Sequence, residues 1–257
     1  MRSSDDIREV FRLAHAGLSK SEIARRVGIA RATVREWLKA GEAAVLASPM
    51  RTREAGPCPR DCPTVKNVDT GAYAYLLGQY LGDGHIVHDH RGVYRLSIYC
   101  CAAYPNIIEE CAAAVTRVLP TNKVDRRRRQ GVMTVGCYSK HLPCLFPQHG
   151  LGLKHQRPIV LQPWQEEIAL VEHPERFLRG LIHSDGWRGM NRVRGANGSA
   201  YAYPRYQFSN RSVDIRQLFV RACDELGVQT RRMNAWTISV AHRDSVARLD
   251  EFVGPKS

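Results

Sequence analysis

The stretch YLLGQYLGDG (Tyr75–Gly84) decides the fold, because it returns in kind as FLRGLIHSDG (Phe177–Gly186). Each copy holds an apolar run, two small residues four positions apart and a closing Asp-Gly pair. The two aspartates, Asp83 and Asp185, are 185 − 83 = 102 residues apart. Two matched copies in one chain indicate an internal duplication, with one motif in each half.

The small residues of the two copies predict a close contact between two helices. Gly78 and Gly82 share one face of the first helix, and Gly180 and Ser184 share one face of the second. Small side chains at this spacing let two helix backbones approach each other closely. If the two helices pack together, the aspartates that end them lie side by side.

The paired aspartates are candidate ligands for a divalent metal. An acid at the C-terminal end of a helix is unfavourable by about 0.3–1 kcal/mol, because the helix dipole is already negative there. Two adjacent acids also repel each other unless a cation lies between them, and oxygen ligands suggest Mg²⁺. The alternative is two ordinary helix ends with solvated acids. Gly84 and Gly186, which follow the acids, are expected in the left-handed conformation that ends many helices.

Both segments resemble the paired motifs of LAGLIDADG homing endonucleases, in the form that carries two motifs in one chain. The second copy, Leu178–Gly186, differs from the letters of the family name at three positions, and the first copy, Leu76–Gly84, matches more loosely. The resemblance covers roughly residues 70–253. It implies an α+β fold in which two pseudo-symmetric αββαββα repeats form an antiparallel-sheet saddle for double-stranded DNA.

Five segments are expected along the chain. Apart from the two motif helices, the patterns of both halves predict the order hairpin, helix, hairpin, helix. We expect a monomer with internal pseudo-two-fold symmetry. The segments are a helix-turn-helix domain (1–45), a linker containing Pro and Cys (46–70), the first repeat (71–149), a connector (150–172) and the second repeat (173–257).

The resemblance implies a site-specific endonuclease that makes Mg²⁺-dependent double-strand breaks, with Asp83 and Asp185 as catalytic, metal-holding acids. Gln207 is the candidate for an additional catalytic residue in the second repeat. The matching region of the first repeat offers only Cys100 and Cys101, which are poor substitutes. This asymmetry leaves open a transcriptional regulator that kept the fold and lost cleavage. An RNA-binding maturase also fits the basic saddle but leaves the N-terminal domain unexplained.

The charge of the chain favours a polyanionic partner. Lys and Arg number 38 against 25 Asp and Glu, a net charge of +13, and the calculated pI is about 9.7. Such a surplus attracts nucleic acid electrostatically. The run Arg126–Arg129 lies on a predicted strand, so alternate members should face the DNA. The candidate DNA-binding residues of the saddle are Arg126, Arg128, Arg188, Arg192, Arg194, Arg205 and Arg231.

Residues 5–42 predict three short helices that resemble the small helix-turn-helix domains of DNA invertases and bacterial regulators. A capping box, Ser19–Glu22, opens the second helix, and Gly28 ends it. In such domains the last helix lies in the major groove. Arg31, Thr33 and Arg35 would point outward there and contact DNA. The alternative is a packing unit with solvated arginines.

The linker contains a possible half of a zinc site. Cys58 and Cys62 are separated by three residues, but no second ligand pair follows nearby in the sequence. His85 and His88 could complete a site only by folding back. The preferred interpretation is two reduced thiols without zinc.

Several absences favour a cytoplasmic, DNA-associated protein. The eight cysteines are scattered and do not form a disulfide framework. The N-terminus lacks the apolar core of a secretory signal, and no apolar run approaches the roughly 20 residues that span a bilayer. We therefore expect an intracellular protein that does not contact a membrane.

Overall fold

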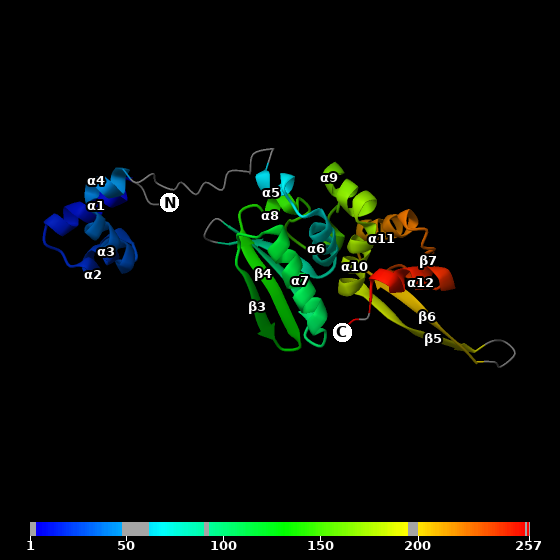
Figure 1. The fold of residues 1–257 in the computed structure, drawn as a ribbon. Helices are drawn as coiled ribbons and strands as arrows, with labels where there is room; N and C mark the ends of the chain where they lie inside the picture. The colour runs from blue at the N-terminus through cyan, green and yellow to red at the C-terminus, as the bar shows by residue number, and fades with distance from the viewer. Residues whose placement is uncertain (1–3, 48–61, 90–92, 195–199, 255, 257) are drawn as a thin grey trace. The chain divides into compact units, whose positions relative to one another are not determined.

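The computed structural model describes residues 4–47, 62–89, 93–194, 200–254 and 256 of the chain. The chain divides into two compact units, Met1–Gly56 and Pro57–Ser257, whose elements are labelled in Figure 1. None of the helices in these described ranges is both long and apolar enough to cross a membrane.

The first unit is a small bundle of helices around an apolar centre. Ser19 begins the second helix, because its hydroxyl accepts a hydrogen bond from the backbone N–H of Glu22 at 3.3 Å. Gly28 ends that helix in the left-handed conformation (φ 65°), as expected. The short α4 was not predicted. The helices are α1 (Ser4–His15), α2 (Lys20–Val27), α3 (Arg31–Ala40) and α4 (Glu42–Ala47), and the buried core is Val10, Leu13, Ile23, Ile29 and Val34.

Two halves of like topology make up the second unit, which confirms the predicted α+β fold of two repeats. Each half contains a four-stranded antiparallel sheet, in the order β1-β2-β4-β3 and β5-β6-β8-β7. The first half consists of α5 (Pro63–Lys66), α6 (Thr70–Asp83), β1 (Gly84–His88), β2 (Tyr94–Cys101), α7 (Pro105–Val118), β3 (Val124–Arg129), β4 (Val132–Ser139) and α8 (Leu142–Leu145). The second half consists of α10 (Pro174–Asp185), β5 (Gly186–Arg194), β6 (Ala200–Ser209), α11 (Val213–Glu225), β7 (Arg231–Arg232), β8 (Thr237–Val240) and α12 (Arg243–Phe252).

The motif helices α6 and α10 pack against each other at the centre of the second unit (Figure 1). A methyl group added to Gly78 would lie 2.5 Å from the backbone oxygen of Phe177 and 2.7 Å from the backbone nitrogen of Leu181. A methyl group on Gly180 would overlap the backbone oxygen of Tyr75. The two backbones therefore touch where the glycines lie.

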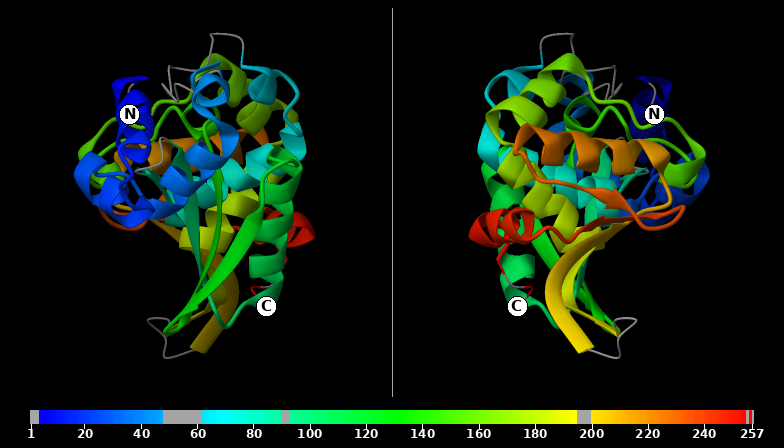
Figure 2. Two further views of the ribbon diagram at one scale, coloured as in Figure 1. Left: turned by 90° about the vertical axis from the view of Figure 1, so that its left-hand side faces the viewer. Right: turned by 90° about the vertical axis from the view of Figure 1, so that its right-hand side faces the viewer.

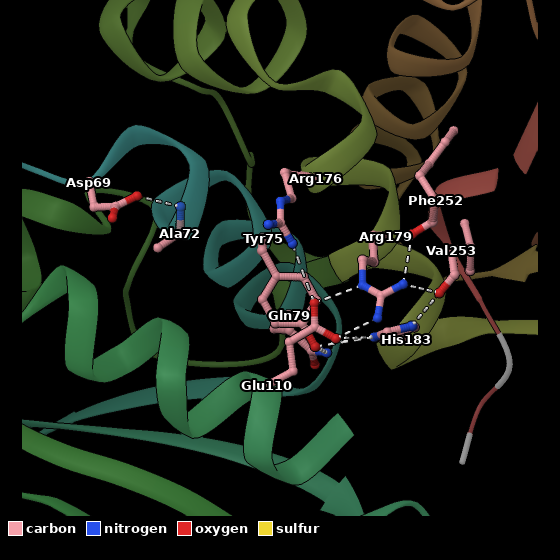
Figure 3. A network of polar contacts seen from close by, with 10 residues as sticks. All are labelled: Asp69, Ala72, Tyr75, Gln79, Glu110, Arg176, Arg179, His183, Phe252 and Val253. Atoms are coloured by element: carbon pink, nitrogen blue, oxygen red, sulfur yellow. Dashed lines mark hydrogen bonds and ion pairs between the residues drawn. The ribbon is translucent and has the colours of Figure 1, made fainter. Parts of the chain in front are cut away.

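The polar residues of the second motif join three helices and the C-terminal segment (Figure 3). Arg179 on α10 donates through Nε and Nη2 to the carboxylate of Glu110 on α7, both at 2.7 Å. His183 Nδ1 lies 3.1 Å from the Tyr75 hydroxyl, and its Nε2 lies 3.0 Å from the backbone oxygen of Val253. Arg179 and His183 are two of the three positions at which the second motif differs from the letters LAGLIDADG. Both thus have polar partners between the repeats.

The connector contains helices that the sequence did not predict. They are the 3-10 turn η1 (Lys154–Gln156), α9 (Pro163–Glu166) and the π-helix η2 (Glu167–Glu172). Gln165 is buried and donates to the Tyr73 hydroxyl at 2.6 Å, while its amide oxygen accepts from Gln148. The connector is therefore part of the core that supports α6.

Candidate functional site

The two aspartates end α6 and α10, and each is followed directly by a strand. The prediction of a left-handed glycine after each acid is wrong: Gly84 has φ −87° and ψ 151°, and Gly186 has φ −96° and ψ 166°. Both are extended because they are the first residues of β1 and β5. A side chain is excluded by space instead, since a methyl group on Gly186 would lie 2.7 Å from the Cα atom of Ile182.

Burial sets the charge state of the two acids. Desolvation and, second, repulsion from Asp185 raise the pKa of Asp83 to about 6, against the attraction of Lys154 and Lys256. Burial also raises the pKa of Asp185, while a hydrogen bond from Asn210 lowers it. Asn210 Nδ2 lies 2.6 Å from Asp185 Oδ2. The acids therefore form a pair whose double ionisation is unfavourable without a nearby cation.

Two lysines cap the same helix ends and were missed by the sequence analysis. Lys154 Nζ donates to three carbonyl oxygens at the end of α6, among them Leu81 at 2.9 Å and Gly82 at 2.8 Å. Lys256 Nζ donates to the backbone oxygen of Gly186 at 2.5 Å. Burial lowers the pKa of both lysines, that of Lys154 to about 8.

A repeated spacing could have revealed these lysines. They are 256 − 154 = 102 residues apart, the same separation as the aspartates. Each lysine follows a glycine by two positions, and both glycines, Gly152 (φ 80°) and Gly254 (φ 67°), are left-handed. The duplicated Gly-x-Lys is therefore a second paired motif. In each repeat it brings the chain back to the C-terminal end of that repeat's own motif helix.

Each acid lines its own pocket, and the two pockets share a wall. Asp83 lies in a pocket of about 210 Å³, together with His85 and Arg157. Asp185 lies in a pocket of about 370 Å³, together with Asn210. Gly82, Leu153 and Lys154 line both pockets. The arrangement thus offers two adjacent positions, each with one half-buried acid.

The four hard carboxylate oxygens fit a divalent cation that prefers oxygen ligands. A dication between Asp83 and Asp185 would compensate their repulsion and the negative ends of both helix dipoles. The residues present therefore fit a metal such as Mg²⁺.

Replacing Asp83 with asparagine is expected to stabilise the metal-free protein at neutral pH. Because the folded pKa of about 6 lies above the ordinary 3.8, the stability contributed by this group is present below pH 3.8 and is lost as the pH rises to about 6. At pH 7.5 the Asp83→Asn variant should unfold with a free energy higher by about 1–3 kcal/mol. Urea unfolding at pH 7.5 and pH 4 measures the difference, which should shrink at pH 4. An equal or lower stability of the variant at pH 7.5 would show that the ionised pair is not strained.

Each sheet has an open face, defined as the face turned away from the helices. In the first sheet, Leu96 and Ile98 point into the core, and Tyr99 on the open face is 43% exposed. In the second sheet, Tyr206 and Phe208 are buried, and Trp187 on the open face is 48% exposed. The hairpin of β5 and β6 extends beyond the helices (Figure 2).

Strand register shows on which side of the first sheet each arginine of β3 lies. Arg126 pairs across the strands with the buried Val135 and lies on the helix side of the sheet. Its guanidinium binds Glu109 of α7 at 2.6 Å. Arg128 shares that side, because it lies two residues further along β3. Arg127 and Arg129, which were not among the predicted DNA contacts, lie on the open face.

Strand register also assigns the candidate residues of the second sheet to its two faces. Arg188 pairs with the buried Tyr206 on the helix side and binds Asp250 of α12 at 2.6 Å. Arg192 and Arg194 follow on that side of β5 at two-residue steps. The open face carries Arg205, Gln207 and Arg231, of which Gln207 lies opposite Trp187. The amide that contacts Asp185 is that of Asn210, which was not among the predicted site residues.

The remaining candidates lie on α3 and in the linker. Arg31 and Arg35 of α3 are exposed, Thr33 is half-buried, and the neighbouring Val34 is fully buried in the small core. Cys58 lies outside the described residues, whereas Cys62 is buried in the second unit.

The two-repeat arrangement of the second unit is the LAGLIDADG fold. Among solved structures with this fold, I-DmoI in complex with DNA and Mn is 17% identical with a TM-score of 0.50, over 72% of this chain and 98% of that chain. An I-DmoI variant in complex with its target DNA and Mn is also 17% identical, with a TM-score of 0.50 over 75% and 96% of the two chains. Residues 2–44 match the family model of a homeodomain-like domain. By sequence, the chain matches no curated protein.

Proposed function

We propose that this protein is a site-specific DNA endonuclease that makes double-strand breaks with Mg²⁺ held by Asp83 and Asp185. The observation that carries the proposal is the meeting of two half-buried acids at the ends of two duplicated helices. The fold supports it, since I-DmoI, with a TM-score of 0.50, was solved bound to DNA and Mn. Two pockets, each with one acid, suit one scissile phosphate in each strand.

The chain's own residues would position the reacting groups. A bound divalent metal supplies Lewis-acid activation of water and of the phosphoryl oxygen. Asp83 and Asp185 would hold that metal through their carboxylates, and the hydrogen bond from Asn210 orients the Asp185 carboxylate and favours its ionised form. Lys154 and Lys256 place positive charge beside the acids, where a phosphate would approach. Because burial brings the pKa of Lys154 to about 8, this lysine can hold or release a proton near neutral pH.

The two open faces are the proposed DNA-binding surface. Arg127 and Arg129 supply charge on the first sheet, and Arg205 and Arg231 supply charge on the second. Exposed aromatic side chains on the same faces offer contact area for sugars and bases: Tyr99, Tyr138, Trp187 and Tyr201. Arginines position DNA through phosphate contacts and read guanine by two-pronged hydrogen bonds.

Opposite faces of one strand allow a matched test of this surface. The double variant Arg127→Ala/Arg129→Ala should bind duplex DNA on the order of tenfold or more weakly and lower the salt dependence of binding by about two phosphate contacts. The double variant Arg126→Ala/Arg128→Ala has the same net charge but should remain close to wild-type affinity. Fluorescence anisotropy across a salt series measures both. Equal losses in the two variants would contradict the assignment of faces.

The first unit is proposed to add a second DNA contact. Arg31 and Arg35 are exposed at the start of α3, the position from which helix-turn-helix proteins reach base edges. This unit also supports the second candidate function, a transcriptional regulator that binds DNA without cutting it. Either function places the protein in a DNA-containing compartment of the cell.

Selection by cleavage distinguishes the two functions. A plasmid library with randomised inserts is incubated with the full chain, with and without added Mg²⁺, and linear molecules are captured and sequenced. An endonuclease yields a defined insert that is enriched only with Mg²⁺. If a parallel selection for binding recovers a defined site that is never cut, the regulator is the correct function.

A further inference from the structure

The segment that follows α12 returns to the end of the second motif helix. Val253, Gly254 and Lys256 belong to this return segment. Val253 is buried, and Gly254 turns the chain in the left-handed conformation (φ 67°). Lys256 Nζ then donates to the backbone oxygen of Gly186 at 2.5 Å and lies 3.5 Å from that of Ser184. The place of Lys256 beside the acids therefore depends on what holds the return segment.

One arginine of the second motif holds the start of the return segment (Figure 3). Arg179 Nη1 donates to the backbone oxygen of Phe252 at 2.7 Å and also to that of Val253. These oxygens lie at the end of α12, so the guanidinium also meets the negative end of that helix dipole. The same guanidinium donates to both carboxylate oxygens of Glu110 on α7. Because one planar group binds both partners, Arg179 ties the return segment to the first repeat.

A buried histidine adds a second bond to the same segment. Gln79 Nε2 donates to the Tyr75 hydroxyl at 2.8 Å, and this hydroxyl can in turn donate to His183 Nδ1 at 3.1 Å. Because Nδ1 then accepts, the ring proton lies on Nε2 and is donated to the backbone oxygen of Val253 at 3.0 Å. The bonds thus run in one direction, from α6 of the first repeat to the return segment of the second.

The two repeats hold their lysines differently. The arginine and the histidine stand where the first motif has Leu77 and Leu81, both fully buried. Lys154 of the first repeat donates to three carbonyl oxygens of α6, whereas Lys256 makes one short bond and one of 3.5 Å to the chain around its own acid. The polar residues of the second motif thus supply an anchor in the repeat whose lysine is held by fewer bonds.

We propose that Arg179 is a positioning residue that acts through Lys256, supported by Glu110 and His183. This inference rests on the proposed function, in which Lys256 places positive charge where a phosphate approaches the acids. Loss of the arginine frees the return segment and moves that charge away. Because Glu110 belongs to α7, the first repeat sets the geometry at the end of the second motif helix.

Labelling of lysine amines tests this arrangement without DNA. The full chain is treated with a trace of acetylating reagent, and mass spectrometry follows the rate at each lysine. Lys256 should react at least about fivefold more slowly than the exposed Lys140, because an ammonium group bound to carbonyl oxygens must first be released. Arg179→Met should remove most of this protection. Arg176→Met is the matched control, since Arg176 Nη1 lies 3.6 Å from the same Glu110 on a side chain that is 54% exposed, and Lys256 should stay protected.

Single-turnover cleavage shows whether Arg179 acts through Lys256. Lys256→Met and Arg179→Met should each slow cleavage at least about tenfold with little change in DNA affinity. The double variant should be no slower than Lys256→Met alone, whereas a merely structural role of the arginine would give losses that multiply. Arg179→Lys keeps the charge but cannot bind the carboxylate and both carbonyls with one planar group, so it should behave like Arg179→Met.

The two measurements can contradict the proposal separately. Equal labelling of Lys256 in the wild-type protein and in Arg179→Met would overturn it, and so would losses that multiply in the double variant. Each variant is first compared with the wild type by thermal unfolding, and Arg179→Lys takes the place of Arg179→Met if the latter does not fold. A wild-type protein that cuts no DNA would overturn the endonuclease function, while the labelling still decides whether Arg179 holds Lys256.

Discussion

The variants Asp83→Asn and Asp185→Asn are each expected to cleave the selected DNA at least about 1,000-fold more slowly than the wild-type protein. Each substitution removes an anionic oxygen from a site in which metal charge supplies several kcal/mol of transition-state stabilisation. DNA binding should stay within a few-fold of wild type, because the loss of one half-buried negative charge does not weaken phosphate contacts. Single-turnover cleavage at saturating protein separates these two effects.

A matched substitution controls for the change of charge. Asp224→Asn alters an exposed acid on α11 and should leave the cleavage rate unchanged. Scoring nicked and linear products also shows whether each acid serves one strand or both. Cleavage by the double Asn variant at more than about a tenth of the wild-type rate would remove both acids from the mechanism.

The second large effect is expected from a single methyl group between the repeats. Gly78→Ala should destabilise the second unit by about 3 kcal/mol or more, because the new methyl group would meet the backbone of α10. Side chains can rotate away from such an overlap, but two backbones can separate only by moving the helices apart. Urea unfolding followed by circular dichroism measures the change. Separation of the helices should also lower cleavage, since it moves the acids.

The same helix provides the control. A methyl group on Gly71 would meet nothing closer than 3.7 Å, and alanine favours helix over glycine. Gly71→Ala should therefore leave stability unchanged or raise it by up to about 1 kcal/mol. If Gly78→Ala were as stable as Gly71→Ala, the close contact of α6 with α10 would not exist in solution.

The duplicated motif made much of the fold predictable from sequence. Paired small residues and paired aspartates depend on spacing along one helix, which a single sequence displays directly. The turn at Gly131 (φ 71°) and the helices that follow each first hairpin also come from local signals. The prediction of left-handed helix ends at Gly84 and Gly186 was wrong. A glycine after the helix is expected both where the helix ends in a turn and where it continues directly into a strand, so the sequence does not distinguish the two cases.

The sequence alone could not show on which face of a strand each arginine lies. Arg126–Arg129 contains four identical side chains, so no alternation shows which pair points toward the helices. The register of β3 against β4 decides it, since Arg126 lies opposite the buried Val135. A shift by one residue would exchange the two pairs completely. Register likewise places Arg188 on the helix side of the second sheet and Arg205 on its open face.

Contacts between distant residues account for the other missed positions. Lys154 reaches the end of α6 from more than 70 positions away, and His141 meets Cys62 from 79 positions away. Such pairs carry no local pattern. The repeated Gly-x-Lys spacing was visible in the sequence, but its meaning depends on knowing which helix each lysine caps.

Mn²⁺ binding to the protein–DNA complex tests the central claim most directly. The full chain is mixed with its selected DNA, and free Mn²⁺ is followed by electron paramagnetic resonance during a titration. We predict binding to the wild-type complex that is lost in the Asp83→Asn/Asp185→Asn double variant, with equal DNA affinity in both. Identical Mn²⁺ binding in the two complexes, or none in the wild type, would show that the paired aspartates do not hold the metal.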